Sequence, residues 1–128
     1  MNVLLDTHAF IGLDSIPEKL SAHGQAICKD PANRLFLSMA SVWEMQIKLN
    51  IGKLNLPRPL PEIIEWQQQN NLIEILPITL RHVYGLALMP DHHRDPFDRL
   101  IIAQAQIEGL TILSQDSEFT AYPVNVIW

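Results

Sequence analysis

Five short, mostly apolar runs constrain the fold of this chain more than any other feature. Such runs fit strands that are covered on both faces, as in parallel sheets, whereas antiparallel sheets usually alternate polar and apolar residues. The runs occupy residues 2–5, 34–38, 72–76, 110–114 and 124–127. We therefore predict a single α/β domain over residues 1–128, with a mostly parallel sheet of about five strands and helices on both faces.

Helical patterns fill the segments between these runs. Thr79 is a suitable N-cap, with Leu80, Val83, Leu86 and Ala87 predicted to face inward. Asp95 and Pro96 are typical of a helix start, and Gly109 of a helix end. We predict helices from about residue 7 and over residues 16–28, 41–51, 62–69, 79–89 and 96–108.

Composition excludes several classes of protein. The chain has 14 acidic and 9 basic residues, a net charge of −5, which argues against binding nucleic acid through a broad basic face. The same charge is compatible with acids that hold cations, or with a basic protein partner. Cys28 is the only cysteine, which excludes an internal disulfide and indicates a reducing, cytoplasmic setting. The opening residues lack the pattern of an export signal, and no apolar run approaches the ~20 residues of a membrane span.

Four acids are predicted to meet at one edge of the sheet. Asp6 and Asp116 directly follow strands, and Glu44 lies in the helix after the second strand. Asp98 lies in the first turn of the helix that leads into the fourth strand, and crossover helices start at the carboxyl edge. Because ligands of open parallel sheets bind at that edge, the four carboxylates are a candidate site.

Each acid also has a structural explanation. Asp6 and Asp116 suit helix N-caps, and Ser41 with Glu44 fits the spacing of a capping box. Asp95 suits the cap of its own helix, and Asp98 suits the first turn. Capping does not, however, require all four acids to lie on the same edge of the sheet.

Electrostatics favours a cation at such a cluster. Two carboxylates ~5 Å apart repel by about 3 kcal/mol at an effective dielectric near 20. Hard oxygen ligands with no soft donor favour Mg²⁺ or Mn²⁺ over zinc or copper. A bound ion of this kind can activate water for phosphodiester hydrolysis. We expect no metal ligand among the histidines, because His92 and His93 are adjacent in a polar loop. Arg94 and Arg99 flank the acids and could contact a phosphate or pair with Asp95.

The motifs resemble those of PIN-domain ribonucleases, most closely the VapC-like toxins of toxin–antitoxin pairs. They are Leu-Leu-Asp6-Thr7-His8, Ser-Val-Trp-Glu44, Asp95-Pro-Phe-Asp98-Arg-Leu-Ile-Ile-Ala and Leu-Ser-Gln-Asp116-Ser-Glu-Phe. Together they span essentially the whole chain. The resemblance implies a Mg²⁺- or Mn²⁺-dependent endoribonuclease that cuts single-stranded RNA with a metal-activated water. It also implies a homodimer and an antitoxin partner.

On this resemblance, Asp6, Glu44, Asp98 and Asp116 match the acidic quartet that holds the metal and performs catalysis. Thr7 and Ser114 match hydroxyl positions beside the acids and, with Arg94 and Arg99, are candidate substrate-binding residues. Ser114 stands where the family often has threonine, a mild departure. Asp95 occurs in one branch of the family, and no catalytic role is carried over to it.

Two alternative functions follow from the same fold. A phospho-acceptor regulatory domain needs an acidic pair after its first strand and an acceptor aspartate after its third. Asp6 has no acidic neighbour and the segment Ile75-Leu76-Pro77 has no acceptor, so we discount this class. A binding module that keeps the fold without its chemistry is the other alternative, and the intact quartet argues against it.

Overall fold

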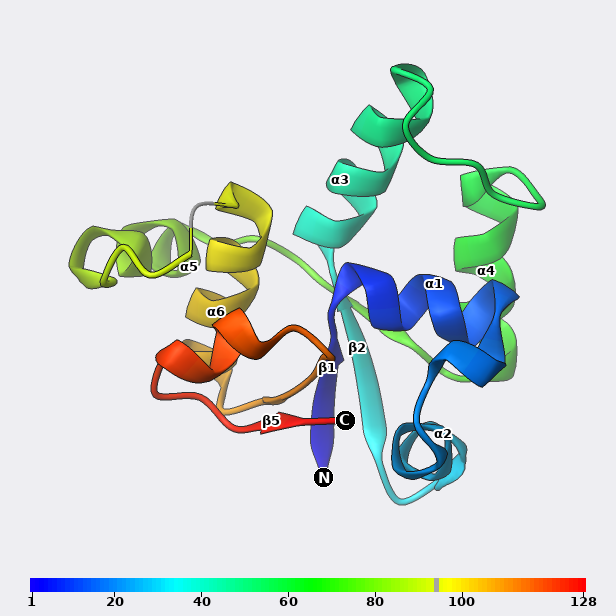
Figure 1. The fold of residues 1–128 in the computed structure, drawn as a ribbon, viewed down its shortest axis with the longest axis horizontal. Coiled ribbons are helices and arrows are strands. Elements are labelled where there is room, and N and C mark those ends of the chain that lie inside the picture. The colour runs from blue at the N-terminus through cyan, green and yellow to red at the C-terminus, as the bar shows by residue number, and fades with distance from the viewer. Residues whose placement is uncertain (94) are drawn as a thin grey trace.

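The computed structural model describes residues 1–93 and 95–128 and contains an open sheet of five parallel strands (Figure 1). The strand order is β3-β2-β1-β4-β5. The register pairs Leu5 of β1 with Leu37 of β2 and with Leu113 of β4, so the three central strands end level with one another. The predicted α/β class and the parallel sheet are confirmed. The strands are β1 (Asn2–Leu5), β2 (Arg34–Ser38), β3 (Glu74–Leu76), β4 (Thr111–Leu113) and β5 (Val126–Ile127).

Helices cover both faces of this sheet (Figure 1). Val3 and Leu5 of β1 pack into a core with the helices on one face, including α1, α2 and α4. Leu4, between them in sequence, points to the opposite face and packs with Ile101 and Ile102 of α6, as the alternation along a strand requires. The α-helices are α1 (Thr7–Ser15), α2 (Ala22–Lys29), α3 (Met39–Asn50), α4 (Leu60–Asn70), α5 (Leu80–Tyr84) and α6 (Pro96–Glu108), and the short 3₁₀ helices are η1 (Pro17–Lys19), η2 (Gly85–Leu88) and η3 (Ser117–Ala121).

Three predicted helices differ from those observed. The helix expected over residues 16–28 is divided into η1 and α2, because Ser21 caps a new helix by accepting the backbone N–H of Gly24. The helix expected from Ser41 starts at Met39, with Ser38 as its N-cap. The helix expected over residues 79–89 has the predicted cap at Thr79, but it continues beyond Tyr84 as the 3₁₀ helix η2.

The prediction that Leu80, Val83 and Ala87 face inward is wrong, whereas Leu86 is partly buried. The exposed fractions of Leu80 and Val83 are 69% and 44%, and Leu88 is 94% exposed. His82 is the buried residue of this helix, and it contacts Glu108 of α6 at 2.9 Å. The apolar side chains of α5 and η2 therefore form an uncovered surface.

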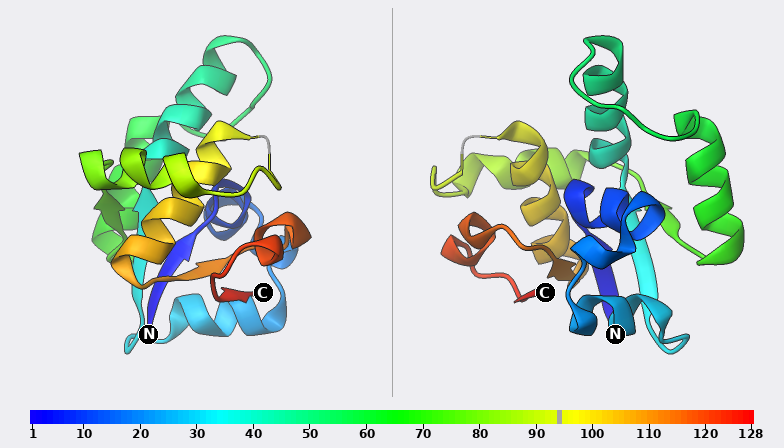
Figure 2. Two further views of the ribbon diagram at one scale, coloured as in Figure 1. Left: turned by 90° about the vertical axis from the view of Figure 1, so that its left-hand side faces the viewer. Right: turned by 45° about the vertical axis from the view of Figure 1, so that its right-hand side comes forward.

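Helix α3 extends beyond the rest of the domain in both views of Figure 2. Its base directly follows β2. Trp43 and Ile47 of this helix and Ile51 just after it are exposed. Within residues 1–93 and 95–128, no helix combines the length and hydrophobicity needed to cross a membrane.

Candidate functional site at the carboxyl edge of the sheet

Asp6 is held at the end of the central strand by contacts to two parts of the chain. One carboxylate oxygen accepts the backbone N–H of Ala9 at 2.7 Å, which makes Asp6 the N-cap of α1. The other accepts the hydroxyl of Ser114, which follows the neighbouring strand β4. Burial raises the pKa of Asp6, and the charge of Asp116 adds to this rise, while the hydrogen bonds from Ser114 and Ala9 oppose it.

Asp116 lies two residues after Ser114 and is tied to the same point. The Ser114 hydroxyl oxygen accepts the backbone N–H of Asp116 at 3.0 Å, so this serine links the two aspartates. Asp116 in turn caps η3 by accepting the N–H of Glu118 at 2.9 Å. The caps predicted for Asp6 and Asp116 are thus present, and both carboxylates lie at the same edge of the sheet.

Glu44 is buried and reaches this edge from α3. Its Oε1 accepts the hydroxyl of Thr7 at 2.7 Å, and its Oε2 pairs with Lys48 at 2.8 Å. Ser41 lies inside the helix, with its hydroxyl 2.9 Å from that of Thr7, so the proposed capping box with Glu44 is wrong. Glu44 does not cap its own helix. Its carboxylate is held by the hydroxyl of Thr7, the residue that follows Asp6.

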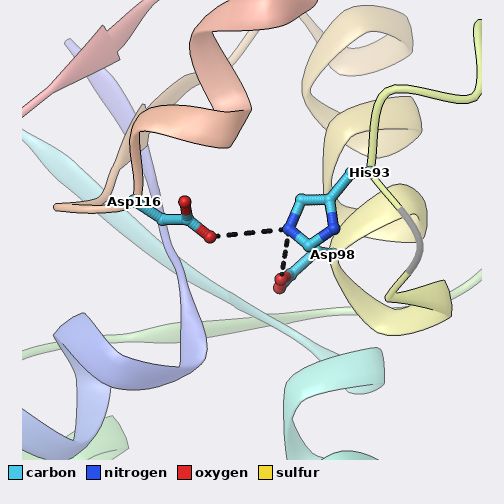
Figure 3. A group of neighbouring side chains, drawn as sticks. All are labelled: His93, Asp98 and Asp116. Atoms are coloured by element: carbon cyan, nitrogen blue, oxygen red, sulfur yellow. Dashed lines mark ion pairs between the residues drawn. The ribbon is translucent and has the colours of Figure 1, made fainter.

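Asp95 and Asp98 have different roles at the start of α6. Asp95 is the N-cap, and one of its oxygens accepts the N–H groups of Phe97 and Asp98 at 2.9 and 3.2 Å. The Asp98 carboxylate instead faces the ring of His93, which also faces Asp116 (Figure 3). This division is the one expected from the sequence, with Asp95 capping the helix and Asp98 left for the cluster.

The pKa of Asp98 responds to burial and to the charges of the neighbouring acids. Burial is the largest cause that raises its pKa to about 7, and repulsion by Asp95, Glu44 and Asp6 adds to it, while His93 lowers it. A carboxyl group with this pKa is close to half protonated at neutral pH. Acids from β1, α3 and α6 are therefore close enough to repel one another.

His93 is the site residue that sequence reasoning missed. Its ring is buried, and Nε2 lies 2.9 Å from Asp98 Oδ2 and 3.5 Å from Asp116 Oδ2 (Figure 3). A third oxygen, from Glu118, is at 3.2 Å. The adjacency of His92 and His93 suggested that neither ring would face the site. In fact His92 is exposed and His93 is buried, so neighbouring positions have opposite environments.

Of the two arginines predicted to contact substrate, the structure describes only Arg99. Arg99 does not pair with Asp95, because its guanidinium contacts the carbonyls of Pro90 and His93 and the Asp91 carboxylate at 3.2–3.3 Å. It therefore holds the loop that carries His93. Arg94 lies outside the described residues.

A cavity of about 620 Å³ adjoins the cluster on the α1 side. Asp6 and Asp116 line one part of it, and Lys19, His8 and Trp128 line the rest together with apolar residues of α1. This volume is in the range of pockets that bind small organic groups. The edge of the sheet thus offers room directly beside two of the acids.

The donor set suits a hard divalent cation. Carboxylate oxygens predominate, and burial and mutual repulsion raise the pKa of both Asp6 and Asp98. Among the described residues, the basic groups that pair with the four acids are Lys48, which contacts Glu44, and His93, which lies against Asp98 and Asp116. A divalent cation would relieve the remaining repulsion, and oxygen ligands favour Mg²⁺ or Mn²⁺.

Together, the fold and the site define a parallel α/β domain with a largely buried acidic cluster at the carboxyl edge of its central strands. The sequence profile described as PIN domain matches residues 3–125. The chain therefore belongs to the PIN domain family, as its motifs had indicated.

Solved structures from three bacteria have folds similar to that of this chain. VapBC2 from Rickettsia felis, bound to a DNA fragment from its promoter, has a TM-score of 0.70 at 16% identity, covering 99% of this chain and 98% of that one. FitAcB from Neisseria gonorrhoeae has a TM-score of 0.65 at 22% identity, covering 98% and 96%. A toxin–antitoxin complex from Klebsiella pneumoniae has a TM-score of 0.62 at 18% identity, with coverage of 98% and 96%. Comparison with curated proteins finds no match.

Proposed function

We propose that this chain is a metal-dependent, single-strand-specific endoribonuclease and the toxin of a toxin–antitoxin pair. One observation carries the proposal. Asp6, Glu44, Asp98 and Asp116 come from four separate segments and lie at one edge of the sheet. Ser114 contacts both Asp6 and Asp116, His93 lies against Asp98 and Asp116, and Thr7, next to Asp6, donates to Glu44. Carboxylates placed this close repel one another, and helix capping alone does not explain why all four lie at the same edge.

In this proposal, Asp6, Asp98, Asp116 and Glu44 hold one or two Mg²⁺ or Mn²⁺ ions. The bound metal would lower the pKa of a water nucleophile and offset charge on the scissile phosphate. Thr7 and Ser114 were candidates for substrate contact, but their hydroxyls contact Glu44 and Asp6. We therefore assign both to orienting carboxylates. Arg99 has its guanidinium engaged by the loop at residues 90–93, which favours a structural role over phosphate binding.

An inactive binding module with the same fold is the remaining alternative. It would not need two buried carboxylates, Asp6 and Glu44, each held by a hydroxyl group from another segment. The phospho-acceptor class is set aside because the chain belongs to the PIN domain family.

Cleavage of a single-stranded RNA oligonucleotide by the purified chain tests the proposal. We expect cleavage with Mg²⁺ or Mn²⁺, arrest by a chelator, and recovery when the metal is restored in excess. A duplex of the same sequence should be cut far more slowly. Absence of cleavage under all metal conditions, together with no rise in melting temperature on adding Mn²⁺, would favour the inactive binding module.

Partners are proposed from the surface and from the relatives. The similar structure from Klebsiella pneumoniae is a toxin–antitoxin complex, which supports an antitoxin as a partner of this chain. The uncovered surface of α5 and η2 provides an apolar interface of the kind that associating subunits bury. We assign this surface to a homodimer. Its large side chains are Leu80, Val83, Tyr84 and Leu88.

The Leu80→Asp variant should convert the homodimer to a monomer. A carboxylate placed in an apolar interface would have to be desolvated on association, whereas on the free monomer it is in water. Light scattering coupled to gel filtration measures the mass directly. Leu72→Asp, at an exposed position outside α5 and η2, is the matched control and should leave the mass unchanged. A parent chain that is monomeric at micromolar concentration would rule out this assignment.

A further inference from the structure

The ring of His93 lies between two acid-bearing segments that are distant in sequence. Its Nε2 faces Asp98 at the start of α6 and Asp116 after β4 (Figure 3). The nitrogen is buried, and although three carboxylate oxygens lie within 3.5 Å, none is aligned for a regular hydrogen bond. Two roles are open to a buried nitrogen in this position. It could bind a cation with its lone pair, or it could donate a proton to the carboxylates.

The other ring nitrogen decides between these roles. Nδ1 of His93 accepts the backbone N–H of Asp95 at 3.2 Å, so Nδ1 carries a lone pair and not a proton. The neutral imidazole has one proton, which must then be on Nε2. Rotating the ring by half a turn would bring carbon atoms to both partners. The hydrogen bond from Asp95 therefore makes Nε2 a donor that faces the carboxylates.

A role as a metal ligand conflicts with this arrangement. Histidine ligands bind metal with one nitrogen and usually donate the proton on the other to an acceptor. If Nε2 bound a cation, the proton would have to move to Nδ1, where it would oppose the N–H of Asp95. His93, Asp98 and Asp116 have the spacing of a three-ligand metal site, but the hydrogen-bond pattern excludes the ring from that set.

The backbone of His93 is fixed in place as well. The hydroxyl of Tyr122 accepts the N–H groups of both His92 and His93, at 3.1 and 2.8 Å, and donates to the carbonyl of Pro90 at 2.9 Å. Arg99 contacts the carbonyl of His93 from the other side. These contacts fix the backbone from which the ring extends, and the hydrogen bond from Asp95 to Nδ1 holds the ring itself.

We propose that His93 is a positioning residue: it donates the Nε2 proton to Asp98 and Asp116, orients these carboxylates, and is not a ligand of the cation they hold. This inference rests on the proposed function, since it concerns the same metal site. Donor geometry that is loose in a metal-free site can tighten when the site is loaded. We expect the Nε2–H to align with Asp98 when the carboxylates turn toward a cation.

Two substitutions separate the functions of the two nitrogens. His93→Gln can place an amide N–H near the position of Nε2, and it lacks the acceptor at Nδ1. His93→Asn can keep an acceptor for the Asp95 N–H, and it lacks the distal donor. We expect His93→Gln to bind Mn²⁺ within about threefold of the parent. His93→Asn should fold normally but bind Mn²⁺ about 10–100-fold more weakly, as is usual for loss of an outer-shell partner.

Calorimetric titration with Mn²⁺ measures these affinities, and nitrogen NMR of the metal-free protein reports which ring nitrogen carries the proton. His92→Asn is the matched control, because His92 is the exposed neighbour, and it should bind Mn²⁺ like the parent. A proton on Nδ1 would overturn the inference, as would equal weakening in both His93 variants. If the parent itself binds no Mn²⁺, the proposed function fails, whereas the NMR result still tests the donor role of His93.

Discussion

The Asp98→Asn variant is expected to cut RNA at least about a hundredfold more slowly than the parent. The change removes a charged ligand from the proposed metal site and leaves the side-chain shape almost the same. Metal assistance contributes several kcal/mol to transition-state stabilisation, and each 1.4 kcal/mol corresponds to about tenfold in rate. Asp6→Asn should have an effect of the same size, because Asp6 faces the same edge from the central strand.

Asp95→Asn is the matched control for this experiment. It makes the same chemical change three residues before Asp98, and asparagine caps helices about as well as aspartate. We expect its cleavage rate to remain within a few-fold of the parent, measured under single-turnover conditions on the same oligonucleotide. Equal losses in Asp95→Asn and Asp98→Asn would show that the two acids do not have the separate roles assigned to them.

The same Asp98→Asn variant should be more stable than the parent when no metal is present. The pKa of Asp98 is about 7 in the folded chain, against about 4 in an unfolded chain. The folded state thus binds this proton more tightly, and the free energy of unfolding falls as pH rises from about 4 to about 7. Above pH 7 the full destabilisation by the carboxylate is present, and the amide removes it. We expect a gain of about 2 kcal/mol at pH 8, or roughly 5–10 °C in melting temperature.

Thermal unfolding in the presence of a chelator, at pH 4.5 and at pH 8, tests this expectation. The difference between variant and parent should be small at the lower pH and large at the higher one. Adding Mn²⁺ at pH 8 should then raise the melting temperature of the parent more than that of Asp98→Asn. A variant that is less stable than the parent at pH 8 would mean that the carboxylate is not under electrostatic strain.

The sheet could be predicted from the sequence because its signals are local. The runs at residues 2–5 and 34–38 each contain three consecutive apolar residues, which fit a strand covered on both faces. The position of the acids followed from the same reasoning, since the strand ends and crossover helices fix which residues lie at the carboxyl edge. Asp95 could be separated from Asp98 because helix caps have a recognisable position.

Features that depend on tertiary contacts could not be predicted in this way. The hydrogen-bond partner of Glu44 is Thr7, which lies 37 residues away. The local spacing of Ser41 and Glu44 predicts a capping box instead, and that prediction is wrong. The burial of His93 depends on Tyr122, which lies 29 residues further along the chain. The apolar spacing in α5 correctly indicated a helix, but spacing does not distinguish a face buried within the chain from one left for a partner.

The place of β1 in the sheet has a consequence for synthesis of the chain. This first strand pairs with β2 on one side and with β4 on the other, and Asp6 is bonded to Ser114, which is 108 residues away. A growing chain on the ribosome can contain Asp6, Glu44 and Asp98 while one edge of β1 still has no neighbour. The acidic site is therefore complete only after almost the whole polypeptide has emerged. On the proposed function, a nascent chain that lacks Ser114 and Asp116 would lack two of the groups that complete the metal site.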